Sequence, residues 1–162
     1  MWYIPNLLFL VLPIPIAFNV LFILHAVASG LGIWLWAHTR GLSRGGRMIS
    51  GLAFAFMPRV YAHLGFGHVG LFYAAAYIPF VLLAAGRLTR REWKFAGLFG
   101  IAFGWQMTAH FQIAFYTALF AGAVFLLELF REYALRDRKA IIRAVLIGAA
   151  ACGLALAVAA DQ

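Results

Sequence analysis

Charged residues are scarce in this chain: they make up 11% of its 162 residues, and only five residues are acidic. A soluble domain usually carries about 25% charged and 45–50% apolar residues, whereas 65% of this chain is hydrophobic. The composition therefore excludes an ordinary soluble domain. Several apolar runs reach or approach the roughly 20 residues that an α-helix needs to cross a bilayer. We expect an all-α, polytopic transmembrane helical bundle that forms one membrane-embedded domain over residues 1–162.

The chain has one cysteine, and the signatures of common enzyme classes are missing. The single Cys152 excludes an internal disulfide, and its alanine- and glycine-rich surroundings favour a packing role over a nucleophilic one. The chain contains no glycine-rich phosphate loop, no Ser-His-Asp order and no HExxH motif. We therefore assign no cofactor and no catalytic residue.

Hydrophobic periodicity, helix breakers and charge predict about six membrane spans. They cover residues 14–37, 47–64, 69–86, 95–109, 111–130 and 141–160. Residues 6–13 are too few to span a bilayer and are bounded by prolines, so they predict a short re-entrant or interfacial N-terminal helix.

Small residues at helical spacing indicate where these helices pack closely. Gly100 and Gly104 form a GxxxG pair, and Ala149, Gly153 and Ala157 form a stripe of the same spacing. The fifth predicted span is bulkier, and we expect it to face lipid in part. Its large aromatic residues are Phe111, Phe115, Tyr116, Phe120 and Phe125.

Twelve of the thirteen basic residues fall in alternate loops between the predicted spans. They are Arg40, Arg44 and Arg47 in the first of these loops, Arg87, Arg90, Arg91 and Lys94 in the second, and Arg131, Arg136, Arg138, Lys139 and Arg143 in the third. In a membrane protein, such residues report topology, so the net charge of +8 does not imply a nucleic-acid partner. We expect these loops in the cytoplasm and both termini outside. Glu128, Glu132 and Asp137 lie among the arginines and balance their charge.

This topology gathers polar side chains at the outer ends of the helices. They are Arg59, Tyr61, His63, His68, Gln106, His110 and Gln112. Arg59 and His63 are four residues apart and share one helical face, and Gln106 and His110 share another. Five of these side chains come from two separate turns and could meet in one outward-facing site: Arg59, His63, His68, His110 and Gln112.

Three interpretations of this group compete. Imidazole suits zinc and similar ions, but no cysteine, carboxylate or H-x-x-x-H pair accompanies the histidines, so we assign no metal. Arg59 beside histidines and amide donors could hold a phosphate or diphosphate. The simplest interpretation is that these groups cap helix ends and anchor at the lipid headgroups. We interpret His110 and Gln112 as binding or capping groups, not as catalysts.

Two isolated polar residues, one an amide and one an imidazole, lie inside the first predicted span. A polar residue at such a position usually faces the bundle and hydrogen-bonds a neighbour, which is the role we expect for Asn19 and His25. A proton relay would need a titratable partner at similar depth, and the sequence shows none.

Four stretches of the chain match a known pattern in the same order. They are "WYIPNLLFLVLP" (2–13), "LHAVASGLGIWLWAHTRGLSR" (24–44), "AHLGFGHVGLFYAAAYIPFVLLAAGRL" (62–88) and "GLFGIAFGWQMTAHFQIAFYTALF" (97–120). Together they resemble the YfhO-type bacterial membrane proteins of the GT-C glycosyltransferase superfamily. In the last stretch, "AHFQIAFYT" takes the place of the family's "GHPQ…Y" pattern.

The resemblance implies transfer of a sugar from an undecaprenyl-phosphate carrier at the outer face of the bacterial inner membrane. The family begins with one more helix and an outer loop that carries the catalytic aspartate, and it continues with further helices. We therefore expect a fragment or reduced form that binds membrane lipids and a polyprenyl-phosphate sugar but is catalytically incomplete, and whether it is an enzyme stays open. The alternative is a non-catalytic structural or accessory subunit that packs against other transmembrane subunits.

Overall fold

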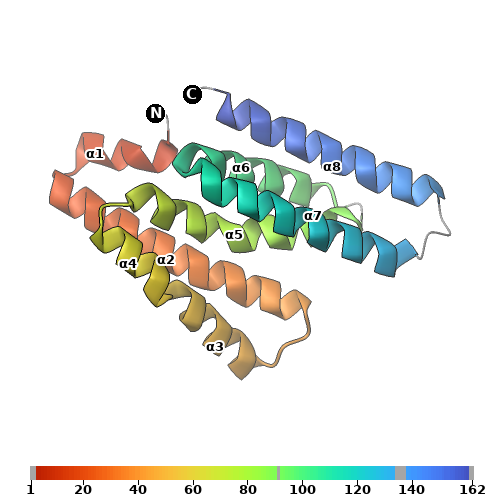
Figure 1. Ribbon diagram of the computed structural model, residues 1–162, viewed down its shortest axis with the longest axis horizontal. Coiled ribbons are helices and arrows are strands. Elements are labelled where there is room, and N and C mark those ends of the chain that lie inside the picture. The colour runs from red at the N-terminus through yellow and green to blue at the C-terminus, as the bar shows by residue number, and fades with distance from the viewer. Residues whose placement is uncertain (1–2, 91, 134–137, 161–162) are drawn as a thin grey trace.

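Helices form all the regular secondary structure in the part of the chain that the computed structural model describes, residues 3–90, 92–133 and 138–160. They are the 3₁₀-helix η1 (Ile4–Leu7) and the α-helices α1 (Leu8–Val11), α2 (Ile14–Thr39), α3 (Arg44–Ala55), α4 (Pro58–Gly65), α5 (Val69–Leu88), α6 (Lys94–Ala109), α7 (Phe111–Tyr133) and α8 (Arg138–Ala159). The long helices run roughly along one axis (Figure 1). The expected all-α architecture is confirmed.

Four helices are long and apolar enough to cross a membrane, which indicates a membrane protein. They are α2, α5, α8 and residues 111–132 of α7. Helix α6 begins and ends within one residue of the predicted 95–109, but its 16 residues extend only about 24 Å, short of the roughly 30 Å of a bilayer core. The prediction of about six spans is therefore not confirmed.

The predicted span 47–64 is divided into two short helices. Helix α3 ends at Ala55 and α4 begins at Pro58, which occupies the first turn of α4. Proline has no backbone N–H to donate and its ring clashes with the preceding turn, so a helix that meets it in its interior is interrupted. The apolar pattern of this segment extends across the interruption, which is why it predicted one span.

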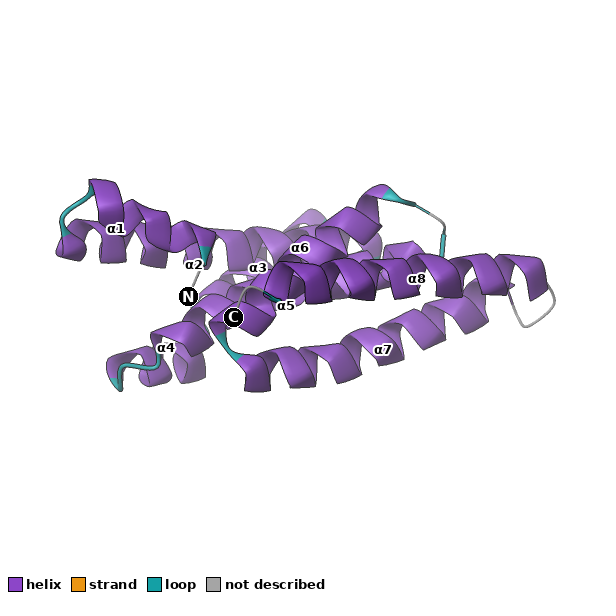
Figure 2. Ribbon diagram, turned by 90° about the horizontal axis from the view of Figure 1, so that it is seen from above, coloured by secondary structure: helices purple, strands orange, loops and turns teal. Residues whose placement is uncertain are grey.

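The N-terminal segment folds back along α2. Helix α2 starts after Pro13, and η1 and α1 run back over its first turns (Figure 2). The short N-terminal helix is thus present, over 4–11 instead of 6–13, and Tyr3 is buried in the bundle at 3% exposure. Its re-entrant or interfacial placement stays a prediction.

Helix α5 is the centre of the bundle. It contacts α2, α4, α6, α7 and α8, and 56% of its most apolar stretch is buried, against 22–28% in the other three candidate spans. Glycines allow the closest approaches to its neighbours. A Cβ at Gly32 of α2 would lie 2.9 Å from the Cβ of Pro79 in α5.

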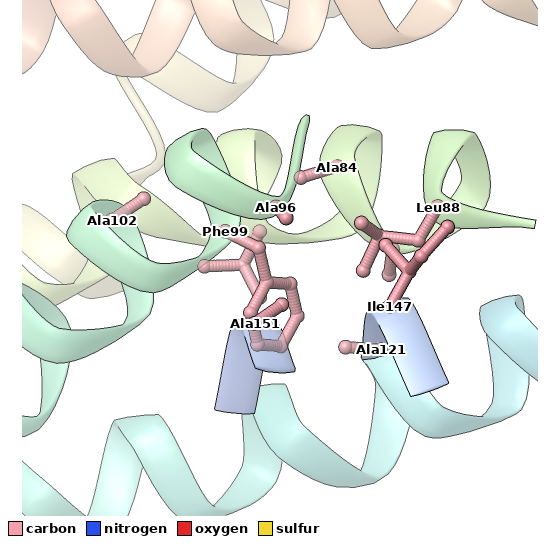
Figure 3. Packing of buried hydrophobic residues seen from close by; sticks show 10 residues of the cluster. Ala84, Leu88, Ala96, Phe99, Ala102, Ala121, Ile147 and Ala151 are labelled. Carbon is pink, nitrogen blue, oxygen red and sulfur yellow. The ribbon is translucent and has the colours of Figure 1, made fainter. Parts of the chain in front are cut away.

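Alanine-rich faces join α5, α6 and α8 into one core (Figure 3). Leu88, Phe99 and Ile147 are its larger members, surrounded by small side chains that let the helices approach closely. The predicted role of Gly100 and Gly104 is confirmed, because a Cβ at either glycine would lie within 2.6 Å of a side chain of α8.

The predicted small-residue stripe on α8 is wrong as a packing face within this chain. Ala149, Gly153 and Ala157 are all exposed. The buried stripe lies on another side of α8 and consists of Ala140, Ala144, Ile147, Ala151 and Ala155. Several small-residue stripes exist in such an alanine-rich helix, and the position of α6 decides which of them is buried.

The aromatic side chains of α7 point mainly outward, as expected. Phe111, Phe115, Tyr116 and Phe120 are 49–69% exposed, while Phe125 packs in part against the core. A wide exposed aromatic and aliphatic surface suits contact with lipid.

The basic segments meet at one end of the bundle. Arg40 at the end of α2 pairs with Glu128 of α7, and the Nε of Arg90 lies 3.5 Å from a carboxylate oxygen of Glu132. These pairs confirm the expected charge balance for both glutamates, while Asp137, Arg91 and Arg136 lie outside the described residues. That this end faces the cytoplasm stays a prediction.

Candidate functional site

Three of the five predicted site residues line one groove at the end of the bundle opposite the ion pairs. Arg59 and His63 come from α4, and Gln112 comes from the first turn of α7. The groove has a volume of about 380 Å³. Its other lining residues are apolar or aromatic: Phe54, Met57, Val60, Leu71, Ala75, Ile78, Ile113 and Tyr116.

The break between α3 and α4 orients the basic side chains of this groove. The Tyr61 hydroxyl donates a hydrogen bond of 2.9 Å to the backbone carbonyl oxygen of Ala55, the last residue of α3. The Tyr61 ring also packs edge-on against Phe22 of α2 and Phe72 of α5. Burial raises the pKa of the Tyr61 phenol, which keeps it protonated as a donor. These contacts fix α4 so that Arg59 and His63 face the groove.

The polar groups of the groove are cationic or neutral donors. Arg59 is exposed and forms no ion pair with any acidic side chain among the described residues. His63 is half-buried, and the exposed ring of His68 lies edge-on to it with 5.7 Å between ring centroids. Gln112 adds an amide that can donate or accept. The arrangement suits an anion attached to an apolar body.

His110 lies apart from the lining of this groove. It ends α6 with an extended backbone, and its backbone N–H donates to the carbonyl oxygen of Gln106 at 3.0 Å. Its ring Nδ1 is buried and has no protein hydrogen-bond partner. His110 is therefore the junction between α6 and α7, and its carbonyl oxygen accepts a 3.1 Å hydrogen bond from the backbone N–H of Ala114 in α7.

Gln106, which the predicted topology placed among the outer polar residues, braces three helices. It is fully buried, and its Nε2 donates to the carbonyl oxygen of Ala74 in α5 at 3.0 Å and to the Thr117 hydroxyl in α7 at 2.9 Å. Its Oε1 has no protein partner. Gln106 thus holds the α5–α6–α7 packing that supports the groove.

Sequence reasoning missed a buried polar network around His25. The Tyr3 hydroxyl lies 2.5 Å from both the Nε2 of His25 and the hydroxyl of Tyr77, and the His25 ring stacks on Tyr73 with centroids 4.2 Å apart. The prediction that His25 faces the bundle is confirmed, but the absence of a titratable partner is wrong. Asn19, by contrast, is exposed, so its predicted inward position is wrong.

The hydrogen bonds of this network have one direction. Nδ1 of His25 lies 2.7 Å from the carbonyl oxygen of Leu21, which can only accept, so Nδ1 carries the ring proton and Nε2 accepts. Tyr3 therefore donates to His25, and Tyr77 donates to Tyr3. Burial, reinforced by the neighbouring Tyr77 phenol, raises the pKa of the Tyr3 phenol well above its ordinary 10.0, so this donor stays protonated.

Among its described lining residues, the groove has one titratable side chain of the kind most often used in acid–base catalysis, His63, and no carboxylate. General acid–base catalysis needs a titratable group within reach of the reacting atoms, most often a histidine or a carboxylate. The carboxylates with described positions, Glu92, Glu128 and Glu132, pair with basic residues at the other end of the bundle. No cluster of three or more metal-ligating side chains occurs within residues 3–90, 92–133 and 138–160.

The fold has four helices long and apolar enough to cross a membrane, and a mainly apolar groove at one end is lined by Arg59, His63 and Gln112. Comparisons with known protein families, with curated proteins and with solved structures gave no match to this chain.

Proposed function

We propose that this chain binds a lipid phosphate at the α4–α5–α7 groove, as part of a GT-C-like glycosyltransferase. The observation that carries the proposal is the meeting of Arg59, His63 and Gln112 at one groove with an otherwise apolar or aromatic lining.

The chemistry of the groove matches both halves of a polyprenyl phosphate. A guanidinium binds phosphate oxygens through charge-assisted and often bidentate hydrogen bonds, and His63 and Gln112 supply further donors. The apolar residues of α5 and α7 beside them provide surface for an isoprenoid chain. The family resemblance described above supports the same class of ligand.

The proposal is tested by binding of farnesyl phosphate to the detergent-solubilised full chain. We expect Arg59→Ala to weaken binding about ten-fold or more, because a hydrogen bond to a charged group contributes roughly 1.5–3 kcal/mol and about 1.4 kcal/mol corresponds to a factor of ten. Gln112→Ala should weaken binding less. Titration followed by microscale thermophoresis measures both effects.

Arg44→Ala is the matched control, because Arg44 is an exposed arginine that does not line the groove. Farnesol, which lacks the phosphate, should bind far more weakly than farnesyl phosphate. Equal binding by the Arg59→Ala and Arg44→Ala variants would contradict the proposal, and so would equal affinity for farnesol.

A second candidate function is a structural subunit of a membrane complex. Exposed Ala149, Gly153 and Ala157 give α8 an outward stripe of small residues, the kind of surface through which membrane helices associate. Purification at fixed stoichiometry with other membrane proteins, without binding of farnesyl phosphate, would favour this function over the first.

A further inference from the structure

A second groove runs between α2 and α3. Its volume is about 470 Å³, and its lining is apolar apart from one basic residue at one end. Gly30 and Gly51 bring the two helices into backbone contact, since a Cβ at Gly51 would lie 2.8 Å from the Gly30 carbonyl oxygen. The residues beside this contact include Val27, Leu31 and Leu52, each about half exposed. The groove is therefore an open apolar slot between α2 and α3, with Gly30 and Gly51 among its lining residues.

Arg47 is the basic residue at the end of this slot. Its Nε donates a 2.8 Å hydrogen bond to the carbonyl oxygen of Leu42, and its guanidinium lies over the Trp34 ring, 5.5 Å from the centroid. These two contacts hold the guanidinium at the groove while leaving its remaining N–H donors without an acidic partner in the described residues. The neighbouring basic residues Arg40 and Arg87, by contrast, each pair with a glutamate.

Charge and shape together identify the occupant. A fixed guanidinium with no carboxylate partner favours an anion, and bidentate geometry favours a phosphate. From Arg47 to Phe56, nine residues along α3, the slot extends about 14 Å, enough for much of an acyl chain. We infer that the α2–α3 groove binds an anionic phospholipid, with its phosphate at Arg47 and one acyl chain along the slot.

This site is separate from the lipid-phosphate groove proposed above. Arg47 lies in the basic end of the bundle and Arg59 in the opposite end, and the two grooves share no lining residue. The Arg59→Ala variant should therefore bind the phospholipid normally, so either proposal can fail without the other.

The test uses phosphatidylglycerol that carries a photoactivatable diazirine in its acyl chain, with the full chain in nanodiscs. We expect cross-links to concentrate on residues 27–31 and 52–56, mapped by mass spectrometry of peptides. One basic residue near a membrane surface contributes about 1 kcal/mol to the binding of anionic lipid, so Arg47→Gln should lower this labelling roughly five-fold. Arg44→Gln, the charge-matched control outside the groove, should not.

Further variants separate the acyl chain from the headgroup. Val27→Trp should fill the slot and reduce labelling, whereas Ile16→Trp, at an exposed position of α2 outside the groove, should not. Arg47→Lys keeps the charge and should retain most of the labelling. This pair of comparisons decides the question even if Arg47→Gln fails to fold.

Three results would overturn the inference. They are labelling spread evenly over α7 and α8, equal labelling by a phosphatidylcholine analogue, and complete competition by glycerol phosphate alone. The second would show an unselective annular lipid, and the third a phosphate site without a seated chain.

Discussion

Tyr3 satisfies two buried polar groups that belong to different helices. Its hydroxyl bonds both His25 of α2 and Tyr77 of α5, and its ring stacks on Tyr73. A single phenol thereby fastens the N-terminal segment to the two helices beneath it. In His25, Nδ1 donates to the carbonyl oxygen of Leu21, and Nε2 accepts the hydrogen bond from Tyr3, so both ring nitrogens have a partner.

Replacing Tyr3 by Phe tests this role through the pH dependence of stability. The raised pKa of Tyr3 means that the folded state holds its proton more tightly, so its contribution is complete below about pH 10 and is lost as the pH rises further. We expect Tyr3→Phe to lower stability by about 1–3 kcal/mol at neutral pH, because His25 and Tyr77 lose their partner. The variant should also lose less stability than the parent chain above about pH 10. Unfolding in detergent at several pH values measures both effects.

Tyr116→Phe is the control for this comparison, since Tyr116 is 49% exposed. Equal stability of the Tyr3→Phe and Tyr116→Phe variants at neutral pH would contradict the proposed fastening. The members of the network are Tyr3, His25 and Tyr77, with Tyr73 stacked beside them. None of the ion pairs and hydrogen bonds found among the described residues joins a carboxylate, lysine or arginine to it.

At the scale of the helices, the effect of a glycine on stability depends on whether a neighbouring helix packs against it. Gly104 of α6 lies against α8, where a Cβ would meet the Val158 side chain at 2.6 Å and the Ala155 carbonyl oxygen at 2.9 Å. Gly153 of α8 has no atom within 4 Å of the corresponding position. Gly104→Ala should therefore destabilise the bundle by about 1–3 kcal/mol, as overpacking does.

Gly153→Ala is the matched control, and it should leave stability unchanged or raise it by up to about 1 kcal/mol, because alanine favours helix more than glycine does. Thermal unfolding in detergent compares the two variants. A similar loss of stability in the two variants would contradict the close contact between α6 and α8 at Gly104, because only Gly104 is expected to be overpacked by an added methyl group.

Periodicity predicted most helix boundaries, because apolar faces repeat with the helical turn. It failed at Pro58, where a local backbone constraint interrupts a continuous apolar pattern. It also selected the wrong stripe of α8, because spacing alone identifies small residues without showing which side meets a neighbour. The buried side depends on Gly100 and Gly104, which lie some fifty residues earlier in the chain.

The candidate site was predictable in part for the same reason. Arg59 and His63 share a helical turn, so their proximity follows from sequence alone. Gln112 joins them only because α4 and α7 both pack on α5 and line the same groove. Tyr3 could have been paired with His25 through the proline turn, since a helical hairpin centred near residue 14 places these two positions opposite each other.

At the scale of the whole molecule, the basic end and the candidate site lie at opposite ends of the bundle. The positive-inside rule then predicts that the ion-paired end faces the cytoplasm and the groove at Arg59 faces outward. In a Cys152→Ser background, we expect a membrane-impermeant maleimide to label Phe66→Cys in intact bacteria. Phe66 is 81% exposed and follows α4 directly.

Gly45→Cys, at an open position in the first turn of α3, should be labelled only after the membrane is permeabilised. Labelling of Gly45→Cys but not Phe66→Cys in intact cells would show the reverse orientation. That result would place the groove at Arg59 on the cytoplasmic side and remove the support that topology gives to an outward-facing carrier.

The interruption at Pro58 has a consequence for how the chain is inserted during synthesis. Helices α3 and α4 contain 12 and 8 residues and extend about 18 and 12 Å, and both contain arginine. Because each helix is short and charged, neither is expected to insert into the bilayer from the translocation channel by itself. Helix α2, which leaves the ribosome just before them, is 26 residues long and strongly apolar. We therefore expect α2 to enter the bilayer before the segment 44–65 does. The segment would then pack on α2 through the contact between Gly30 and Gly51.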